Sequence, residues 1–214
     1  MKINILAIIL FILVPLNSMA QVSQIDSLKV AVNELPNDSN KVNAYINLAK
    51  SYTRIDADSA LMYCNSAIKI GRESGFYAGV ANAYRQIGIV HYMKGEYEKA
   101  IDNFTLSLQT WQDAGDEKGV GRAYMNIGII HFNLGQYDKA LENYMKSSEI
   151  QMRINDVDGL ARSNNNIANI YTYQNNTGLA LEYSFKSLKS HEELGNEEEI
   201  AYTLYILEIF MKHS

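Results

Sequence analysis

Amide side chains recur at one position of a repeated pattern, and this side-chain type can hold a peptide backbone. Asn47, Gln86, Asn126 and Asn166 occupy that position in four successive units. A carboxamide carries both hydrogen-bond donors and an acceptor, so it can pair with the N–H or the C=O of an extended chain. The repetition predicts a row of amides along a binding surface.

A second position holds basic side chains. Arg122 and Arg162 share it, and Arg85 lies close to it in the pattern. A guanidinium group can bind a carboxylate through two parallel hydrogen bonds. Adjacent helices lie ~8–10 Å apart and an extended chain advances ~3.3 Å per residue, so a matching ligand would carry a carboxylate at about every third residue.

The candidate groove combines these two rows with their neighbours on the same helix faces. We expect it to bind an extended, acidic segment of another protein. Its residues are Asn47, Lys50, Arg54, Asn82, Arg85, Gln86, Ile89, Arg122, Asn126, Ile129, Asn133, Arg162, Asn166, Asn169 and Tyr173.

Charge is distributed unevenly in a way that supports this hypothesis. The stretches 39–55, 74–95, 118–137 and 159–181 contain no Asp or Glu, whereas all 24 acidic residues lie elsewhere. The alternative explanation is that these helices are more enclosed and have lost charge for that reason. Enclosure accounts for the missing acids but not for the Lys and Arg residues that these stretches keep.

The elements that position these residues come from a repeat of 40 residues. Three similar segments begin at Gly79, Gly119 and Gly159, and the middle one reads GVGRAYMNIGIIHFNLGQYDKALENY. Each unit shows two stripes with apolar residues at i, i+3, i+4 and i+7, which indicates two helices. A fixed period of this length is typical of a solenoid. We therefore predict an all-α fold, an α-solenoid of antiparallel helix hairpins.

Turn and packing residues follow the same period. Residues that tolerate a left-handed backbone are expected directly after the helices; they are Gly75, Gly95, Gly115, Gly135, Asn155, Asn175 and Gly195. Small residues are expected where paired helices cross closely; they are Gly88, Gly128 and Ala168 on the first helices and Ala100, Ala140 and Ala180 on the second.

A weaker first unit precedes these three. Its turn is one residue shorter, and its Cys64 occupies the core position of Phe104 and Tyr144, which predicts a buried thiol. The expected boundaries are a cleaved signal peptide over 1–20, a capping helix over 21–36, four units within 37–196 (37–75, 76–115, 116–155 and 156–195) and a capping helix over 197–214.

The signal peptide is predicted from the first twenty residues. Lys2 precedes an apolar run over 3–16, and small residues, Ser18 and Ala20, flank Met19 before Gln21. This arrangement is typical of a secretory signal cut before Gln21, and an uncleaved anchor is the alternative. The run is short for a membrane span, which needs ~20 residues. We expect an exported, secreted or periplasmic protein without a span after cleavage.

Bulk composition restricts the partners further. The chain has a formal charge of −5 and no basic cluster, which argues against nucleic acid. Cys64 is the single cysteine, so no internal disulfide can form.

The repeats resemble the tetratricopeptide repeat over residues 42–211. The match is carried by Tyr124, Ile127, Gly128, His131, Gly135, Tyr137, Ala140 and Tyr144, with His131 standing where the family has tyrosine. The 40-residue spacing is similar to the longer subclass in mitotic-spindle adaptors and kinesin light chains. The resemblance implies a right-handed superhelix whose first helices line an inner groove, and it implies a protein partner. In spindle adaptors of similar pattern, asparagine and arginine at matching positions bind acidic peptides.

Other functions have weaker support. An enzyme is disfavoured because His91 and His131 hold equivalent aromatic positions, which predicts core histidines, and no catalytic motif is present. We expect no cofactor and no metal. A sensory or regulatory array related to two-component sensors, stand-alone or shortened, is the main alternative. Self-association to a homodimer through the last helix is another, using Tyr202, Tyr205, Ile206 and Ile209.

Overall fold

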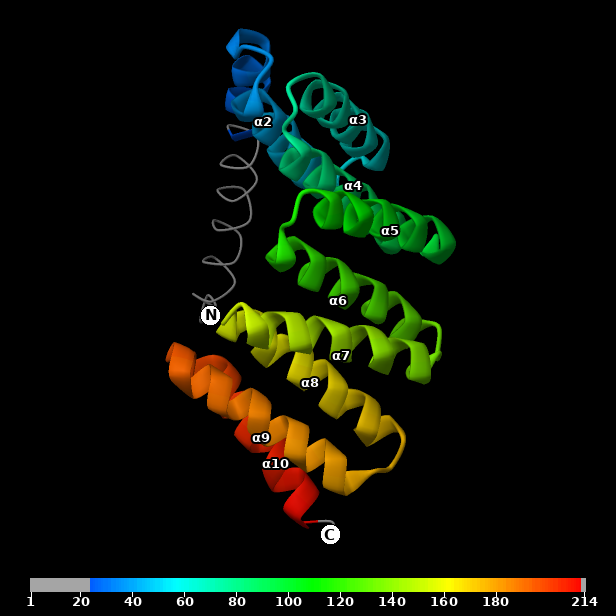
Figure 1. The fold of residues 1–214 in the computed structure, drawn as a ribbon, viewed down its shortest axis with the longest axis vertical. Coiled ribbons are helices and arrows are strands. Elements are labelled where there is room, and N and C mark those ends of the chain that lie inside the picture. The colour runs from blue at the N-terminus through cyan, green and yellow to red at the C-terminus, as the bar shows by residue number, and fades with distance from the viewer. Residues whose placement is uncertain (1–23, 213–214) are drawn as a thin grey trace, which may run out of the picture. The chain divides into compact units, whose positions relative to one another are not determined.

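The computed structural model describes residues 24–212, and all regular secondary structure within that range is helical (Figure 1). The predicted signal peptide lies outside the described residues. The side chains of Tyr202, Tyr205, Ile206 and Ile209 also lie outside the description. The chain divides into a first compact unit, Met1–Val90, and a second compact unit, His91–Ser214. These compact units are distinct from the 40-residue repeats, and each is described by itself.

The first unit contains a helical segment over 24–34, followed by α2 (Ser39–Tyr52), α3 (Ala57–Glu73) and most of α4 (Tyr77–Met93). Its core joins the three labelled helices, because Ala49 of α2, Cys64 of α3 and Ile87 of α4 pack in one cluster. Leu48 and Cys64 are fully buried. Burial raises the pKa of the Cys64 thiol to about 12, as expected for a core cysteine.

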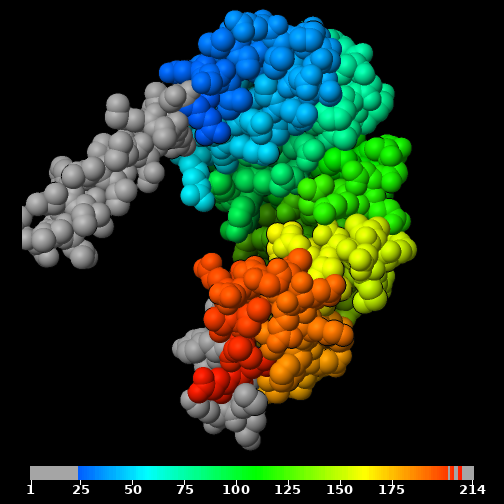
Figure 2. Space-filling view, turned by 90° about the vertical axis from the view of Figure 1, so that its left-hand side faces the viewer, coloured from blue at the N-terminus to red at the C-terminus, as the bar shows by residue number. Residues whose placement is uncertain are grey.

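The second unit contains α5 (Tyr97–Asp113), α6 (Glu117–Asn133), α7 (Tyr137–Arg153), α8 (Val157–Tyr173), α9 (Thr177–Leu194) and α10 (Glu197–Lys212). Each helix contacts the next one along the chain. Helix α6 also contacts α8, so the first helices of two successive 40-residue repeats are direct neighbours. Figure 2 shows the last part of this stack, where yellow α8 passes into orange and red α9 and α10.

The predicted turns are confirmed. Asn155 and Asn175 have positive φ, and so do the five glycines Gly75, Gly95, Gly115, Gly135 and Gly195. A backbone hydrogen bond spanning five residues closes these turns, as between Gln136 N and His131 O at 2.8 Å, which is the Schellman pattern. The shorter first turn is also confirmed, because Asp56 N bonds to Tyr52 O across four residues instead.

The close helix crossing is confirmed at Gly128. A Cβ atom added there would lie 2.6 Å from Cε1 of Tyr144 on the paired helix. Tyr144 is itself only 2% exposed, so its ring has no space to retreat into. The small residues predicted on the second helices are fully buried; they are Ala100, Ala140 and Ala180.

We therefore predict that Gly128→Ala destabilises the protein by about 1–3 kcal/mol, the usual cost of overpacking a core. Gly178→Ala is the control, because a Cβ there would meet only Asn176 Oδ1, at 3.9 Å. Alanine is the better helix former, so the control should be neutral or slightly stabilising. Urea unfolding of the two variants measures both effects. Equal stability of the two would contradict the close crossing.

Candidate functional site: polar faces of the first helices

Helices α6 and α8 carry the same polar stripe. Arg122 and Asn126 on α6, and Arg162 and Asn166 on α8, stand four residues apart, which places each pair on one helix face. Because α6 and α8 are in direct contact, the two stripes lie on adjacent helices of the second compact unit.

The amides of this unit differ in their surroundings. Asn126 and Asn166 are half-buried, whereas Asn169 is exposed. Asn126 Nδ2 is buried and has no hydrogen-bond partner among the described residues. Asn133 is already engaged, because its Nδ2 donates to the Tyr92 hydroxyl at 3.0 Å. Asn126 therefore carries a buried donor that no described residue accepts.

The two arginines also differ. Arg122 is half-buried and forms no ion pair within the part of the chain that the structure describes. Arg162 is exposed and pairs with Asp158, one turn earlier on α8. Exposed pairs of this kind contribute only ~0–1 kcal/mol, so a ligand carboxylate could compete with Asp158 for Arg162.

The apolar members of the candidate set line the same helices. Ile129 packs against the core cluster around Tyr144 and Ile167. Tyr173 is 62% exposed and stacks on Tyr137, with ring centroids 5.7 Å apart. Tyr173 therefore presents a broad aromatic surface at the end of the α8 stripe.

In the first compact unit, the corresponding residues are on α2 and α4. Gln86 points inward: it is 2% exposed and its Nε2 donates to Thr53 Oγ1 at 2.7 Å. It does not present its amide to solvent as the sequence pattern suggested. Asn47 is exposed and its Oδ1 accepts from Lys50 Nζ at 3.4 Å.

The remaining candidates of the first compact unit are two arginines and two uncharged residues. Arg54 is exposed, Arg85 is half-buried, and Asn82 and Ile89 are half-buried beside it. Desolvation lowers the pKa of Lys50, and the charge of Arg85 lowers it further.

His91 and His131 are half-buried rather than in the core as predicted, and each bonds across a turn. His91 Nδ1 lies 2.6 Å from Glu96 Oε2, and His131 Nδ1 lies 2.8 Å from Gln136 Oε1. Each imidazole therefore bonds across the turn to the residue directly before the next helix. No group of three or more metal-ligating side chains occurs within residues 24–212.

Within residues 24–212, no helix is both long and apolar enough to cross a bilayer.

These observations define a solenoid of consecutive packed helix pairs. A family model for the tetratricopeptide repeat matches residues 42–113 and 119–193, which is more than half of the chain. The protein therefore belongs to the tetratricopeptide repeat family. A comparison with curated protein sequences found no match.

Solved structures with this fold include the apo form of RapI, with a TM-score of 0.77 and 21% identity, covering 91% of this chain and 55% of that one. Aspartyl phosphate phosphatase F from Bacillus subtilis has a TM-score of 0.74 and 17% identity, covering 79% of this chain and 45% of that one. A Rap protein complexed with Competence and Sporulation Factor has a TM-score of 0.61 and 17% identity, covering 90% and 58%. The chain thus spans about half the length of the first two.

Sequence reasoning did not find a cavity between α7, α8 and α9 that Ser148, Asn164 and Ser190 help to line. The signal was nevertheless present in the repeat. The residues forty positions earlier are Leu108, Tyr124 and Ile150, so three bulky side chains give way to three small polar ones.

The histidine–turn pairs predict a pH dependence. The hydrogen bond from His91, followed by that from Lys99, lowers the pKa of Glu96 below its ordinary value of about 4.5. A carboxylate with a lowered folded-state pKa stabilises the fold above its unfolded pKa, and this contribution is lost as the pH falls through the folded value. Glu96→Gln, which copies the His131–Gln136 pair, should therefore be less stable than wild type at pH 7 and lose less stability on acidification below about 4.5.

Thermal unfolding of wild type and variant between neutral pH and mildly acidic pH measures this difference. Glu98→Gln, a change at an exposed position of the same helix, is the control and should follow the wild-type curve. If Glu96→Gln also follows that curve, the pair does not hold the turn.

Proposed function

We propose that this protein is an exported binding module whose α6–α8 face takes an extended, acidic segment of another protein. The proposal rests mainly on Arg122, which is half-buried without an ion pair among the described residues. It lies one turn from Asn126 on a pair of adjacent helices whose stretches 118–137 and 159–181 contain no acid. A partly buried charge attracts a counter-charge more strongly than one in bulk water.

The amides add a means of holding the ligand backbone. An unsatisfied buried donor costs ~1–3 kcal/mol, so a ligand acceptor that pairs with Asn126 Nδ2 would recover this free energy. Rotation of the half-exposed side chain would bring this donor to a ligand carbonyl. Asn166 occupies the same position one unit later and would hold the next part of the ligand.

The family and its neighbours support binding as the activity. Tetratricopeptide repeats are protein-interaction scaffolds, and one structural neighbour was solved in complex with Competence and Sporulation Factor. In the first compact unit, Lys50 and Arg54 are exposed and offer a second patch of the same sign. Acidic residues in the ligand suit either patch.

A charge-reversal experiment tests the ligand-binding face. Arg122→Glu combined with Arg162→Glu should weaken binding of a labelled peptide with glutamate at every third position by at least about tenfold, while the helical circular dichroism remains. Fluorescence polarisation measures the affinity. The control is Lys69→Glu with Lys139→Glu, which changes net charge equally at exposed positions of second helices. Undiminished binding by the arginine variant would refute the proposal.

Releasing Arg162 provides the opposite test. Asp158→Asn removes the carboxylate that pairs with Arg162, so the same peptide should bind more tightly, and increasing salt should weaken that binding. Asp138→Asn, an exposed change in the first turn of α7, should leave the affinity unchanged. If the two variants behave alike, Arg162 is not part of the binding face.

Export is a separate part of the proposal, and it rests on the first twenty residues. Expression of the full chain in a bacterial host should yield an exported protein that begins at Gln21, detected by intact mass and N-terminal sequencing. Ala20→Tyr should block cleavage, because the peptidase needs a small residue there. Ala31→Tyr, beyond the cleavage site, is the control. A full-length product retained inside the cell would contradict export.

A further inference from the structure

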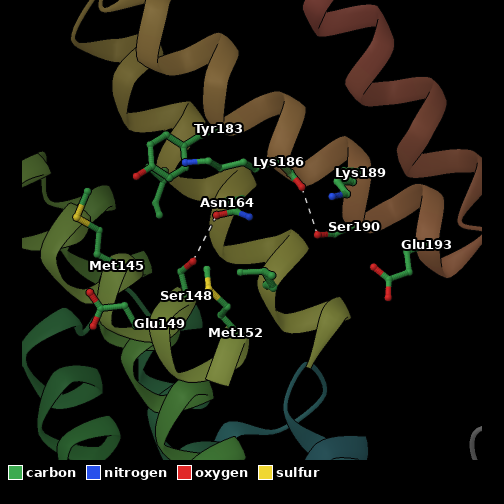
Figure 3. A pocket seen from close by; sticks show the side chains of 12 residues that line it. Met145, Ser148, Glu149, Met152, Asn164, Tyr183, Lys186, Lys189, Ser190 and Glu193 are labelled. Carbon is green, nitrogen blue, oxygen red and sulfur yellow. Dashed lines mark hydrogen bonds between the residues drawn. The ribbon is translucent and has the colours of Figure 1, made fainter. Parts of the chain in front are cut away.

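A cavity of about 450 Å³ opens between α7, α8 and α9 of the second unit (Figure 3). Its volume lies within the range of ~300–1,000 Å³ that is usual for small-ligand sites. None of its lining residues belongs to the polar stripes of α6 and α8. It is therefore distinct from the acidic-peptide face.

The repeat explains why a cavity exists here. In the preceding unit the equivalent positions hold Leu108, Tyr124 and Ile150, and here they hold Ser148, Asn164 and Ser190. All three replacements line the cavity. Bulk is lost at these three positions, although Met145 and Tyr183, which also line the cavity, replace the smaller Thr105 and Asn143.

The tyrosine position is the most informative of the three. Tyr84 and Tyr124 occupy it in the two earlier units, and Lys146 Nζ lies 5.5 Å from the centre of the Tyr124 ring. In the last unit Asn164 replaces the ring, and the equivalent lysine, Lys186, instead lies 4.2 Å from the ring of Tyr183.

Asn164 leaves hydrogen-bonding capacity in the cavity. It is only 4% exposed, and its Oδ1 accepts from Ser148 Oγ at 3.4 Å. Its Nδ2 donates to no residue that the structure describes, and in Figure 3 it lies on the side of the amide away from Ser148. Ser190 Oγ donates to Lys186 O at 3.2 Å, so its lone pairs remain open to a donor.

We propose that this cavity binds a tyrosine side chain of a partner polypeptide. The ring would lie against the apolar lining formed by Met145, Leu160 and Ile167. A phenol hydroxyl can accept and donate at once, so it would accept from Asn164 Nδ2 and donate to the Ser190 hydroxyl. The ligand would thus restore from outside the tyrosine that the repeat lacks at this position.

The size and rim of the cavity favour a polypeptide over a free phenol. A lone phenol leaves much of the volume unfilled, whereas a tyrosine with its neighbouring residues occupies more of it. Met152 at the rim is 65% exposed, and residues next to the tyrosine would cover it. Lys189 and Glu193, one turn apart on α9, offer both charges to the polar groups of a peptide.

Calorimetric titration with three probes tests the assignment. The blocked tripeptide Gly-Tyr-Gly should bind, and Gly-Phe-Gly should bind at least about tenfold more weakly, because it leaves the Asn164 donor unpaired. Para-cresol should also bind more weakly than the tyrosine tripeptide. Equal affinity of the phenylalanine tripeptide would overturn the phenol assignment, and equal affinity of para-cresol would overturn the polypeptide assignment.

Two variants refill the cavity with side chains that the preceding unit already accommodates. Asn164→Tyr and Ser190→Ile should each abolish binding of the tyrosine tripeptide and leave the melting temperature unchanged or higher. The Arg122→Glu and Arg162→Glu double variant should keep this binding, which separates the cavity from the acidic-peptide face. Wild-type affinity in both filled variants would refute the proposal.

Discussion

The close crossing of paired helices is the constraint on which the remaining structure depends. At Gly128 the backbone of α6 approaches the Tyr144 ring so closely that one methyl group would overlap it. Such contact holds only if each helix returns along its partner at the same register in every unit. The left-handed residues after the helices make that return possible, and the constant 17-residue length of helices such as α5, α6 and α7 keeps the register from one repeat to the next.

A serine on the second helix reinforces the same register. Ser147 donates to Gly121 O at 2.8 Å, and Ser187, forty residues later, donates to Ala161 O at 3.0 Å. All of these atoms belong to buried helix pairs, where an unpaired hydroxyl would be costly. The hydrogen bonds therefore fix the sliding position of each pair, while the small residues fix its separation.

Most of the fold could be predicted from the sequence because these constraints recur at visible positions. Periodic glycine and asparagine marked every left-handed turn, and the repeated alanines marked the buried crossings. Side-chain partners were harder to predict. Gln86 turns inward and donates to the Thr53 hydroxyl, a partner at the end of another helix that the repeat pattern does not mark. Arg162 pairs with Asp158, which lies one turn earlier on the same helix. This acid was overlooked because it stands one residue outside the acid-free stretch 159–181.

The cavity was missed for a related reason: periodicity draws attention to positions that repeat, whereas this site arises where the repetition fails. In a solenoid each unit is stabilised mainly by its neighbours, so one unit can lose core volume while the others maintain the fold. Asn164 shows what such a loss leaves behind, a nearly buried amide with an unused donor in a partly apolar space. This amide faces an open cavity with apolar walls, so it can pair with a polar group of a ligand that also fills the apolar space, and that combination is the physical reason to regard the interruption as a binding site.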